Sequence, residues 1–474
     1  MKGTMQLKPY PTYKPAGVPW LQQVPEHWDV RRIKTLVREM ESRSKDGKEL
    51  LMSLSKSKGL VPQTELGGKA PSAKTHVGYK ICEPDQIVMN RMQAWNGLFG
   101  LAKQHGMVSP DYAVFNILED HHPYFLQQVF RTPIVVEQFA NASKGIGSGF
   151  NRLYTDKFGA IAVPVAPPEE QHLIVRYLHA LDAKVKHYIR TKRTLIARLQ
   201  EQKQAIIQQA VTRGLDPNVK LKPSGVEWLG EVPEHWEVQS FGNGLSLLQT
   251  GPFGSQLHAE DYRAGGIPVI NPSHILGRSI VPDVQVAVSP ETASRLKRHH
   301  IKAGDIVAAR RGEIGRCALA GVENEGWICG TGSVRLTPVP SLFNAEYLVY
   351  LLTSSGVREH LLLTSIGATM NNLNSGALAR MRVPRPSVYE QMGIVTFIDA
   401  ELQRCDTAIA NASKGISCMI EYHTRLIADV VTGAVDVRAA AKAMAVDAED
   451  QTIEEEPLSM AAEEEAEYGE DTEL

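Results

Sequence analysis

At 474 residues the chain has room for two to four domains, and its hydrophobic content of 43% is that of an ordinary globular protein. It contains no run of 18 apolar residues, so we expect no membrane-spanning helix, and its start lacks the apolar stretch of a secretory signal. Five scattered cysteines without a CxxC pair favour a reduced, cytoplasmic protein without structural zinc.

The net charge of −2 hides an uneven distribution along the chain. Residues 447–474 contain 13 of the 53 acidic residues and no Lys or Arg, which leaves 40 acidic against 51 basic residues in the body. This surplus of about 11 positive charges suits a polyphosphate partner, because neutralised phosphates release counterions. A soluble protein with unevenly spread charge is the alternative.

A segment near the N-terminus returns in the second half of the chain. KPAGVPWLQQVPEHWDV (14–30) and KPSGVEWLGEVPEHWEV (222–238) share 12 of 17 positions, and residues 146–175 align without a gap on 366–395. We infer one unit used twice, as in a monomer that imitates a two-fold dimer. Duplex DNA is the commonest ligand that offers two equivalent half-sites.

After an irregular start, the first copy is predicted to be a mixed α/β domain. Up to residue 165, short apolar runs such as 87–89 and 112–115 alternate with turn signals. Pro167 and Pro168 then precede two glutamates, which is typical of a helix start, and neither Pro nor Gly follows until Gly214. This pattern predicts a helix of about 44 residues, roughly 66 Å long.

The second half repeats this order, with mixed α/β sequence to about 385 and a second helix from about 388 to 432. Apolar residues in both helices step by three and four, which is the spacing of a coiled-coil seam. Asp182, Lys192, Lys203 and His423 interrupt the pattern. The alternative is two amphipathic helices that pack only on their own domains. The predicted seam, which is also the predicted docking region for partners, consists of Val175, Leu178, Val185, Ile189, Ile196, Leu199, Val395, Ile398, Leu402, Ile409, Ile416, Met419 and Leu426.

The duplication also predicts the direction of the second helix. To make equivalent contacts it has to run back towards the first domain, so the pair is antiparallel and Val437 lies near residues 14–17. The predicted fold class is α+β, with two mixed α/β domains separated by two long helices in an antiparallel coiled coil and related by a pseudo-two-fold internal duplication. The predicted divisions are 1–166, 167–215, 216–386 and 387–437, followed by an acidic tail at 438–474 that we expect to be disordered.

Motifs of catalysis and nucleotide binding are missing or incomplete. No GxxxxGK[ST], HExxH or GxSxG sequence occurs, and the glycine-rich run 145–149 follows no clear strand. The sequence Asn-Pro-Ser-His at 271–274 lacks the second proline and the aromatic ring of the amino-methyltransferase loop that it faintly resembles. We therefore expect no catalytic residue, no metal and no cofactor on this chain.

The two copies of PEHW contain His27 and His235. A catalytic role is one hypothesis for them. A structural role is favoured, because the neighbouring Trp, Pro and Val are typical of a packed corner.

The order of these parts resembles that of the specificity subunit of type I restriction–modification systems. The resemblance covers residues 14 to about 437. It rests on the twin GVxWL…VPEHW segments, the IGxxxNxL stretches before VP and the EQxxIV helix starts. Segments 78–100 and 304–321 also resemble internal parts of that family's target-recognition domains.

The resemblance implies a non-catalytic, cytoplasmic subunit of a prokaryotic phage-defence and DNA-methylation system. Residues 1–166 and 216–386 would be target-recognition domains, each reading half of a split site in double-stranded DNA. The helices would set the gap and dock two adenine-methyltransferase (modification) subunits. S-adenosylmethionine, ATP and Mg would be bound by partner subunits, including any restriction subunits that join the complex. Half-sites about one DNA turn (~34 Å) apart lie on one face of the duplex, so lengthening both helices should widen the gap alone.

Base readers need Arg, Lys, Asn, Gln or Ser side chains at the groove edges. Two domains that read different sequences should differ at their readers, as the pairs Arg152/Asn372 and Met92/Arg311 do in this chain. For each candidate the alternative is a solvated charge or a turn-stabilising amide. The candidates are Arg91, Gln93, Lys144, Asn151 and Arg152 in the first domain, and Ser255, Gln256, Arg310, Arg311, Asn371 and Asn372 in the second.

Two further hypotheses belong to other classes. A stand-alone DNA-binding protein would not need long docking helices, and co-purification with a methyltransferase would distinguish the two. A stand-alone enzyme would need catalytic residues that the sequence does not offer. The acidic tail is either a solubilising end or a competitor of DNA for the basic surface.

Overall fold

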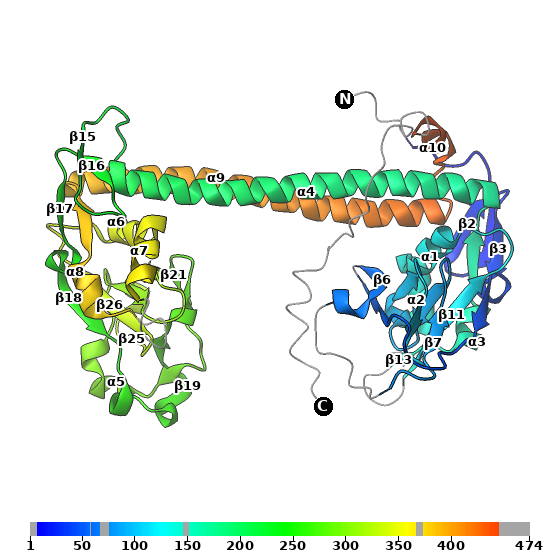
Figure 1. Ribbon diagram of the computed structural model, residues 1–474, viewed down its shortest axis with the longest axis horizontal. Coiled ribbons are helices and arrows are strands. Elements are labelled where there is room, and N and C mark those ends of the chain that lie inside the picture. The colour runs from blue at the N-terminus through cyan, green and yellow to red at the C-terminus, as the bar shows by residue number, and fades with distance from the viewer. Residues whose placement is uncertain (1–6, 57, 67–74, 146–150, 366–372, 445–474) are drawn as a thin grey trace. The chain divides into compact units, whose positions relative to one another are not determined.

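The computed structural model describes residues 7–56, 58–66, 75–145, 151–365 and 373–444 (Figure 1). The chain divides into two compact units. Unit 1 comprises residues 1–192 and 414–474, and unit 2 comprises residues 193–413. The helical regions predicted as separate divisions are therefore shared between the units, because each helix end packs into a globular core.

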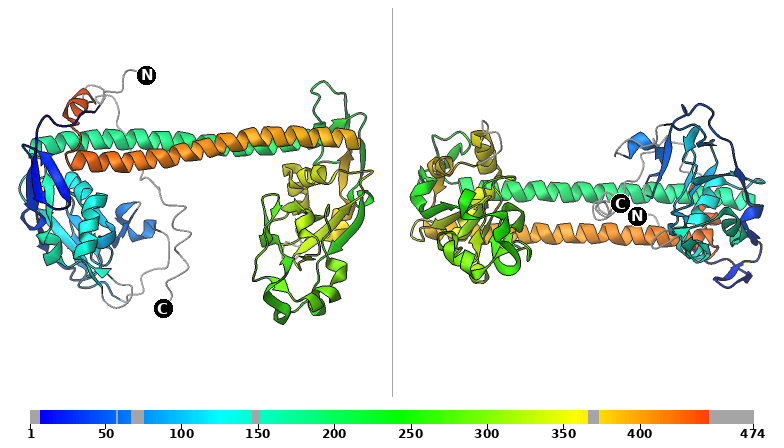
Figure 2. Two further views of the ribbon diagram at one scale, coloured as in Figure 1. Left: turned by 180° about the vertical axis from the view of Figure 1, so that it is seen from behind. Right: turned by 90° about the horizontal axis from the view of Figure 1, so that it is seen from below.

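The two predicted long helices are α4 (Pro168–Arg213) and α9 (Val388–Val431). In unit 1 the first part of α4 meets the last part of α9, where His423 Nε2 lies 2.5 Å from an Asp182 oxygen. In unit 2 the last part of α4 meets the first part of α9, where Lys203 donates to Asp406 over 2.5 Å. The helices are thus antiparallel, and Figures 1 and 2 show them side by side.

Burial along the seam depends on what else covers the helices. The seam residues that are buried are Val175, Leu178, Val185, Ile189, Val395, Ile398, Leu402 and Leu426. The half-buried ones, which a single neighbouring helix leaves partly open, are Ile196, Leu199, Ile409, Ile416 and Met419. Three of the four interrupting residues form the two cross-helix pairs above, so most of the polar breaks in the pattern are paired.

The core of unit 1 is built on a four-stranded antiparallel sheet. Alternate side chains face opposite sides, as in any strand, so Ile87 and Met89 join the main core while Val88 packs in a smaller one. The sheet order is β4 (Val37–Met40), β11 (Tyr112–Ile117), β8 (Ile87–Asn90), β9 (Phe99–Leu101). The main core adds α1 (Pro123–Arg131), α2 (Pro133–Ala142) and α3 (Thr155–Ala160), and the smaller one adds β5 (Met52–Ser55), β6 (Gly59–Pro62), β7 (Lys80–Cys82) and β10 (Gly106–Val108).

Unit 2 repeats this plan with different additions. Its sheet has the order β18 (Leu245–Thr250), β26 (Ser333–Pro338), β23 (Ile306–Ala309), β24 (Cys317–Leu319). Ile306 faces the main core, as Ile87 does in unit 1, and Val307 faces a smaller core. The helices are α5 (Pro290–Arg295), α6 (Ala345–Thr353), α7 (Ser355–Ser365) and α8 (Ser375–Arg380), and a second sheet joins β19 (Tyr262–Ile270), β22 (Ala287–Val288) and β25 (Ile328–Cys329).

Short strand pairs at the base of each unit carry the duplicated sequence. In both units a hairpin is followed by a strand that pairs with the strand just before a long helix. In unit 1 these are β1 (Tyr13–Val18) with β2 (Leu21–Pro25), and β3 (Asp29–Arg32) with β14 (Ala162–Val165). In unit 2 they are β15 (Leu221–Pro223) with β16 (Glu231–Pro233), and β17 (Glu237–Ser240) with β27 (Arg382–Arg385).

The segment after α9 differs from the prediction. Val437 is buried in the same core as Ala16, so its predicted position near residues 14–17 is confirmed. The tail was expected to begin at residue 438, but residues Arg438–Met444 form helix α10, whose Ala440 and Ala441 are buried in that core. Alanines were not recognised as core residues because the prediction relied on large apolar side chains. Residues 445–474 lie outside the described part of the chain.

Candidate nucleic-acid interface

A buried tryptophan in each unit joins the start of one long helix to the end of the other. In unit 1, Trp28 is fully buried and donates to Glu170 Oε1 over 3.2 Å, and His27 Nε2 lies 2.7 Å from Glu170 Oε2. Glu170 stands in the first turn of α4, where the helix dipole favours a carboxylate. Gly433, just past α9, has φ +80° and leaves no space for a Cβ, which would lie 2.4 Å from Pro25 Cδ.

The corner of unit 2 repeats this arrangement. Trp236 is fully buried and donates to Glu390 Oε1 over 2.9 Å, and His235 Nε2 lies 3.2 Å from Glu390 Oε2. Gly214, just past α4, has φ +73° and packs on the Trp236 ring. The two PEHW segments therefore form packed corners, as the sequence predicted.

The corner of unit 1 carries one additional layer. The Tyr10 hydroxyl donates to Glu170 over 2.5 Å, and the Arg438 guanidinium lies 5.0 Å from the Tyr10 ring centre. Burial, followed by the bond to Glu170, raises the pKa of Tyr10. This layer leaves Glu170 more enclosed than Glu390, with side-chain exposures of 7% and 27%.

One arginine stands at the end of a central strand in each unit, and the two occupy equivalent positions. Arg91 follows β8 and Arg310 follows β23, and the carbonyl of each accepts a bond from a leucine N–H that the duplication also pairs. Leu153 donates to Arg91 over 3.0 Å, and Leu373 donates to Arg310 over 2.8 Å. The same alignment places Arg311 opposite Met92, as the sequence comparison proposed.

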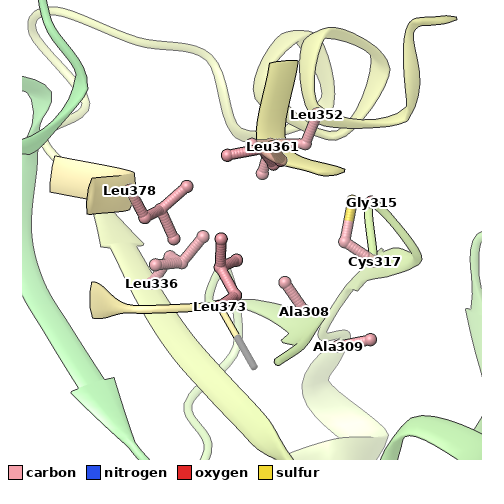
Figure 3. Close-up of a pocket in the computed structure, with 9 residues that line it drawn as sticks. All are labelled: Ala308, Ala309, Gly315, Cys317, Leu336, Leu352, Leu361, Leu373 and Leu378. Carbon is pink, nitrogen blue, oxygen red and sulfur yellow. The ribbon is translucent and has the colours of Figure 1, made fainter. Parts of the chain in front are cut away.

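Leu373 is anchored in an apolar hollow beneath Arg310. Figure 3 shows its side chain among Ala308, Leu336 and Leu378. The remaining cavity of about 10 Å³ has room for one water at most and an apolar lining, so it reflects packing and does not suit a ligand.

The guanidinium of the candidate Arg91 is bonded to other side chains of unit 1. It pairs with Glu39 and donates to Thr155 Oγ1 over 3.3 Å, while Lys80 also donates to Glu39, over 2.9 Å. Gln93 is exposed and precedes the short helix at Ala94–Asn96.

The other candidates of unit 1 lie beside this turn. Asn151 and Arg152 form β13 and pair with Lys144 and Gly145 of β12. Asn151 is exposed, and Arg152 donates to Asp111 over 3.1 Å while stacking on the Tyr154 ring. The fold thus brings the five unit 1 candidates to one end of the sheet, and their roles as readers stay predictions.

Arg310 and Arg311 in unit 2 have no such partner. Their backbone N–H groups both donate to the Gly332 carbonyl, over 2.8 and 3.3 Å, but neither guanidinium forms an ion pair within the described ranges. Burial, followed by the charge of Arg311, lowers the pKa of Arg310. Two adjacent uncompensated cations are what a phosphate or a guanine edge would bind.

The remaining candidates of unit 2 are only partly described. Gln256 is exposed in the short helix at Gly254–Gln256, which also contains Ser255. Asn371 and Asn372 lie outside the described residues, directly before Leu373.

One exposed aromatic ring near the arginines was missed in the sequence. Phe253 is 59% exposed, in the loop that follows β18. Gly251 in this loop donates to the Ser333 carbonyl over 3.0 Å, next to the Gly332 carbonyl that binds Arg310. An aromatic residue between glycines in a loop was the available signal.

The Asn-Pro-Ser-His segment forms a short helix, Pro272–His274, with Asn271 as its N-cap. The Asn271 N–H donates to His274 Nδ1 over 3.1 Å.

Among the described residues, no three His, Cys, Asp or Glu side chains could hold a metal ion. Burial raises the pKa of Cys317 and Cys329 to about 12, which keeps both thiols protonated. None of the described helices is long and apolar enough to cross a membrane.

Comparison with known proteins supports the family resemblance. Residues 233–413 match the model of the family described as Type I restriction modification DNA specificity domain. The chain is 23% identical over 249 residues to the Type I restriction enzyme MjaVIII specificity subunit of Methanocaldococcus jannaschii. That match covers 52% of this chain and 56% of the relative, so the chain spans about half the length of this curated protein.

Two solved structures share the fold. The first comes from a study of complex assembly and conformational transition of the type I R-M system, with a TM-score of 0.62 over 87% of this chain and 99% of that one. The second is the crystal structure of the HsdS subunit from Thermoanaerobacter tengcongensis, with a TM-score of 0.52 over 87% and 98%. Both are 16% identical to this chain.

Proposed function

Because residues 233–413 match the family model of the type I restriction modification DNA specificity domain, we propose that this chain is the DNA specificity subunit of a type I restriction–modification complex. The chain itself is non-catalytic in this proposal. Each unit reads one half of a bipartite site in double-stranded DNA.

The observation that carries the proposal is the duplicated frame around different surface residues. Equivalent corners at Trp28 and Trp236 hold the helices, whereas equivalent strand ends are followed by unlike residues, Met92 in unit 1 and Arg311 in unit 2. A protein that reads two unlike half-sites needs this combination of a constant frame and divergent contact residues.

The partners in this proposal are those that the family resemblance implies. Two modification subunits dock on the long helices and bring S-adenosylmethionine, and restriction subunits bring ATP and Mg. The place of action is the prokaryotic cytoplasm, where DNA is accessible. The helices act as the spacer between half-sites.

The test is to map methylated adenines by single-molecule sequencing. DNA from cells that express the chain with its modification subunit is compared with DNA from cells that lack the chain. The expected result is one split motif with two short half-sites and an unspecified gap, lost when the chain is absent. Identical methylation in both strains, with the modification subunit shown to be active, would contradict the proposal.

A further inference from the structure

Unit 1 contains a groove beside the last part of α9. It lies between the hairpin at Leu21, the junction of α1 and α2, and the last part of α9, and encloses about 510 Å³. Ala428 and Asp429 of α9 and Ile134 of α2 are among its walls. We refer to it as the α9 groove.

The equivalent place in unit 2 is filled by a glutamine of the chain itself. The 220-residue offset of the duplication pairs Ala428 with Gln208 of α4. Gln208 Oε1 accepts bonds from the Gly356 N–H over 2.8 Å and from the Ser355 hydroxyl over 3.3 Å, at the start of α7. A Cβ on Gly356 would lie 2.9 Å from Gln208 Nε2 and 3.2 Å from the Trp228 ring, so this amide is tightly packed.

Unit 1 lacks this side chain, and α2 begins without the bond that Gln208 makes to α7. Helix α2 starts at Pro133, and the next N–H, that of Ile134, is bonded to none of the described residues. An unbonded N–H in the first turn of a helix is available to an acceptor from outside the helix.

The charges along the groove also lack partners. Glu421, Arg425 and Asp429 follow one another at four-residue intervals on α9, and none forms an ion pair with a described residue. Their equivalents in unit 2 are Glu201, which pairs with Arg198 over 3.1 Å, and the neutral Ala205 and Gln209. The charged side chains on the wall of the α9 groove therefore lack ion-pair partners among the described residues, whereas the one charged equivalent in unit 2 has a partner.

We propose that the α9 groove is a docking site for a modification subunit, and that a carboxamide side chain of that subunit takes the place that Gln208 fills in unit 2. This inference rests on the proposed function. It adds that the two docking faces are not equivalent, since Gln208 occupies in unit 2 the place that Ala428 leaves open in unit 1.

A carboxamide suits the groove because it both accepts and donates. Its oxygen meets the Ile134 N–H, as the Gln208 oxygen meets Gly356. Its NH₂ group meets Asp429 or the oxygens of Thr424 and Thr432, whose hydroxyl hydrogens already donate to α9 carbonyls over 3.0 and 2.7 Å. A carboxylate would face Glu421 and Asp429, and an ammonium group would leave Ile134 without an acceptor.

The test places in the α9 groove of unit 1 the glutamine side chain that Gln208 provides in unit 2. Ala428→Gln is titrated against purified modification subunit by calorimetry, and native mass spectrometry counts the subunits bound. The wild-type chain is expected to show a tight and a weaker site. The affinity of the tight site should be about tenfold lower in the variant, which corresponds to the loss of two hydrogen bonds to the partner. Gln208→Ala, which opens unit 2, is the matched control and should leave the tight site unchanged.

The outcomes separate the two proposals. Two equal sites in the wild-type chain, or unchanged binding to both Ala428→Gln and Ala428→Leu, would overturn the groove inference and leave the proposed function intact. No binding by the wild-type chain would count against the proposed function itself. Thermal unfolding of each variant excludes a loss of binding that comes from misfolding.

Discussion

Units 1 and 2 share a frame but differ at the end of one strand. Arg91 and Arg310 occupy equivalent positions, yet the Arg91 guanidinium pairs with Glu39 while the Arg310 guanidinium forms no ion pair with a described residue. The strand registers explain the difference, because Glu39 lies opposite Phe115 and its equivalent opposite Leu336 is Leu248. One change in a neighbouring strand is thus enough to turn an internal ion pair into an available cation.

The comparison separates two kinds of residue. The central residues of the two corners, a tryptophan, a histidine and a glutamate, are identical in the two units. Residues at the end of the sheet differ between the units in identity and in pairing, as Met92/Arg311 and the contacts of Arg91 and Arg310 do. Each of the following variants tests one side of this distinction.

The largest expected effect is loss of a corner tryptophan. Trp28→Ala removes a fully buried ring and leaves Glu170 with one donor fewer, so unit 1 should lose about 3–5 kcal/mol of stability. Trp236→Ala should cost unit 2 a similar amount. Hydrogen exchange resolved by peptide, with denaturant, would measure each unit separately. Equal destabilisation of both units by either variant would show that the corners are not independent.

The second variant removes the available cations. Arg310→Ala with Arg311→Ala should weaken specific DNA binding about 100-fold and lower the salt dependence by about two charges. Arg91→Ala is the matched control, because this arginine already has a carboxylate partner, and it should change the affinity far less. Fluorescence anisotropy at several salt concentrations would measure both quantities.

Leu248→Glu sharpens the same comparison. It rebuilds in unit 2 the carboxylate that Glu39 provides in unit 1, so it should weaken DNA binding without removing either arginine. If Arg91→Ala instead matched the double variant, the pairing with Glu39 would not persist on DNA, and the distinction between the units would fail.

The third variant concerns the polar interruption of the seam in unit 1. Asp182 accepts from His423 and from the Tyr124 hydroxyl, over 2.5 and 2.9 Å, whereas its equivalent in unit 2 is the buried Leu402. Asp182→Leu should cost about 1–3 kcal/mol, because it removes the hydrogen bonds that Asp182 makes with His423 and Tyr124. Adding His423→Leu should recover part of that loss, since an apolar pair often replaces a buried polar pair without cost. Urea unfolding would measure both, and a double variant less stable than the single one would contradict this account.

The helices and the packed corners could be predicted from the sequence because both are local signals. Forty-odd residues without Pro or Gly define α4, and apolar residues at steps of three and four define α9, each to within a residue or two. Trp28 stands in a segment rich in Pro and Val. The state of each candidate reader could not be predicted. Whether Arg91 is paired depends on Glu39, which is 52 residues away in sequence and becomes its neighbour only through the sheet. The small residues of α10 carried too little hydrophobic signal to be recognised.

The fourth variant tests a difference in acid sensitivity. The Gln171 and Gln391 side chains accept equivalent bonds, each of 2.8 Å, from the backbone N–H of His122 in unit 1 and Asn344 in unit 2. Burial, followed by the charges of His172 and His179, lowers the pKa of His122 below 6.5. The unfolded chain therefore binds this proton more readily than the folded one, so stability is lost as the pH falls below about 6.5.

His122→Asn should remove this contribution from unit 1. The unfolding free energy of the variant should fall less between pH 7.5 and pH 5.5 than that of the wild-type chain, by at most about 1.4 kcal/mol per pH unit. His121, whose pKa burial also lowers, keeps part of the acid sensitivity in both proteins. An identical pH dependence would mean that His122 is protonated in the folded state without cost.

The smallest effect concerns the acidic tail, which differs from both units in charge. Residues 447–474 carry 13 acidic residues, while the rest of the chain is basic. Because α10 belongs to the core of unit 1, the deletion should begin after Met444 and not at residue 439. If the tail competes with DNA for basic surface, its removal should tighten non-specific binding a few-fold at 50 mM salt and leave it unchanged at 300 mM, where screening is strong. A variant that also removes α10 should lose stability instead, which distinguishes competition by charge from damage to the fold.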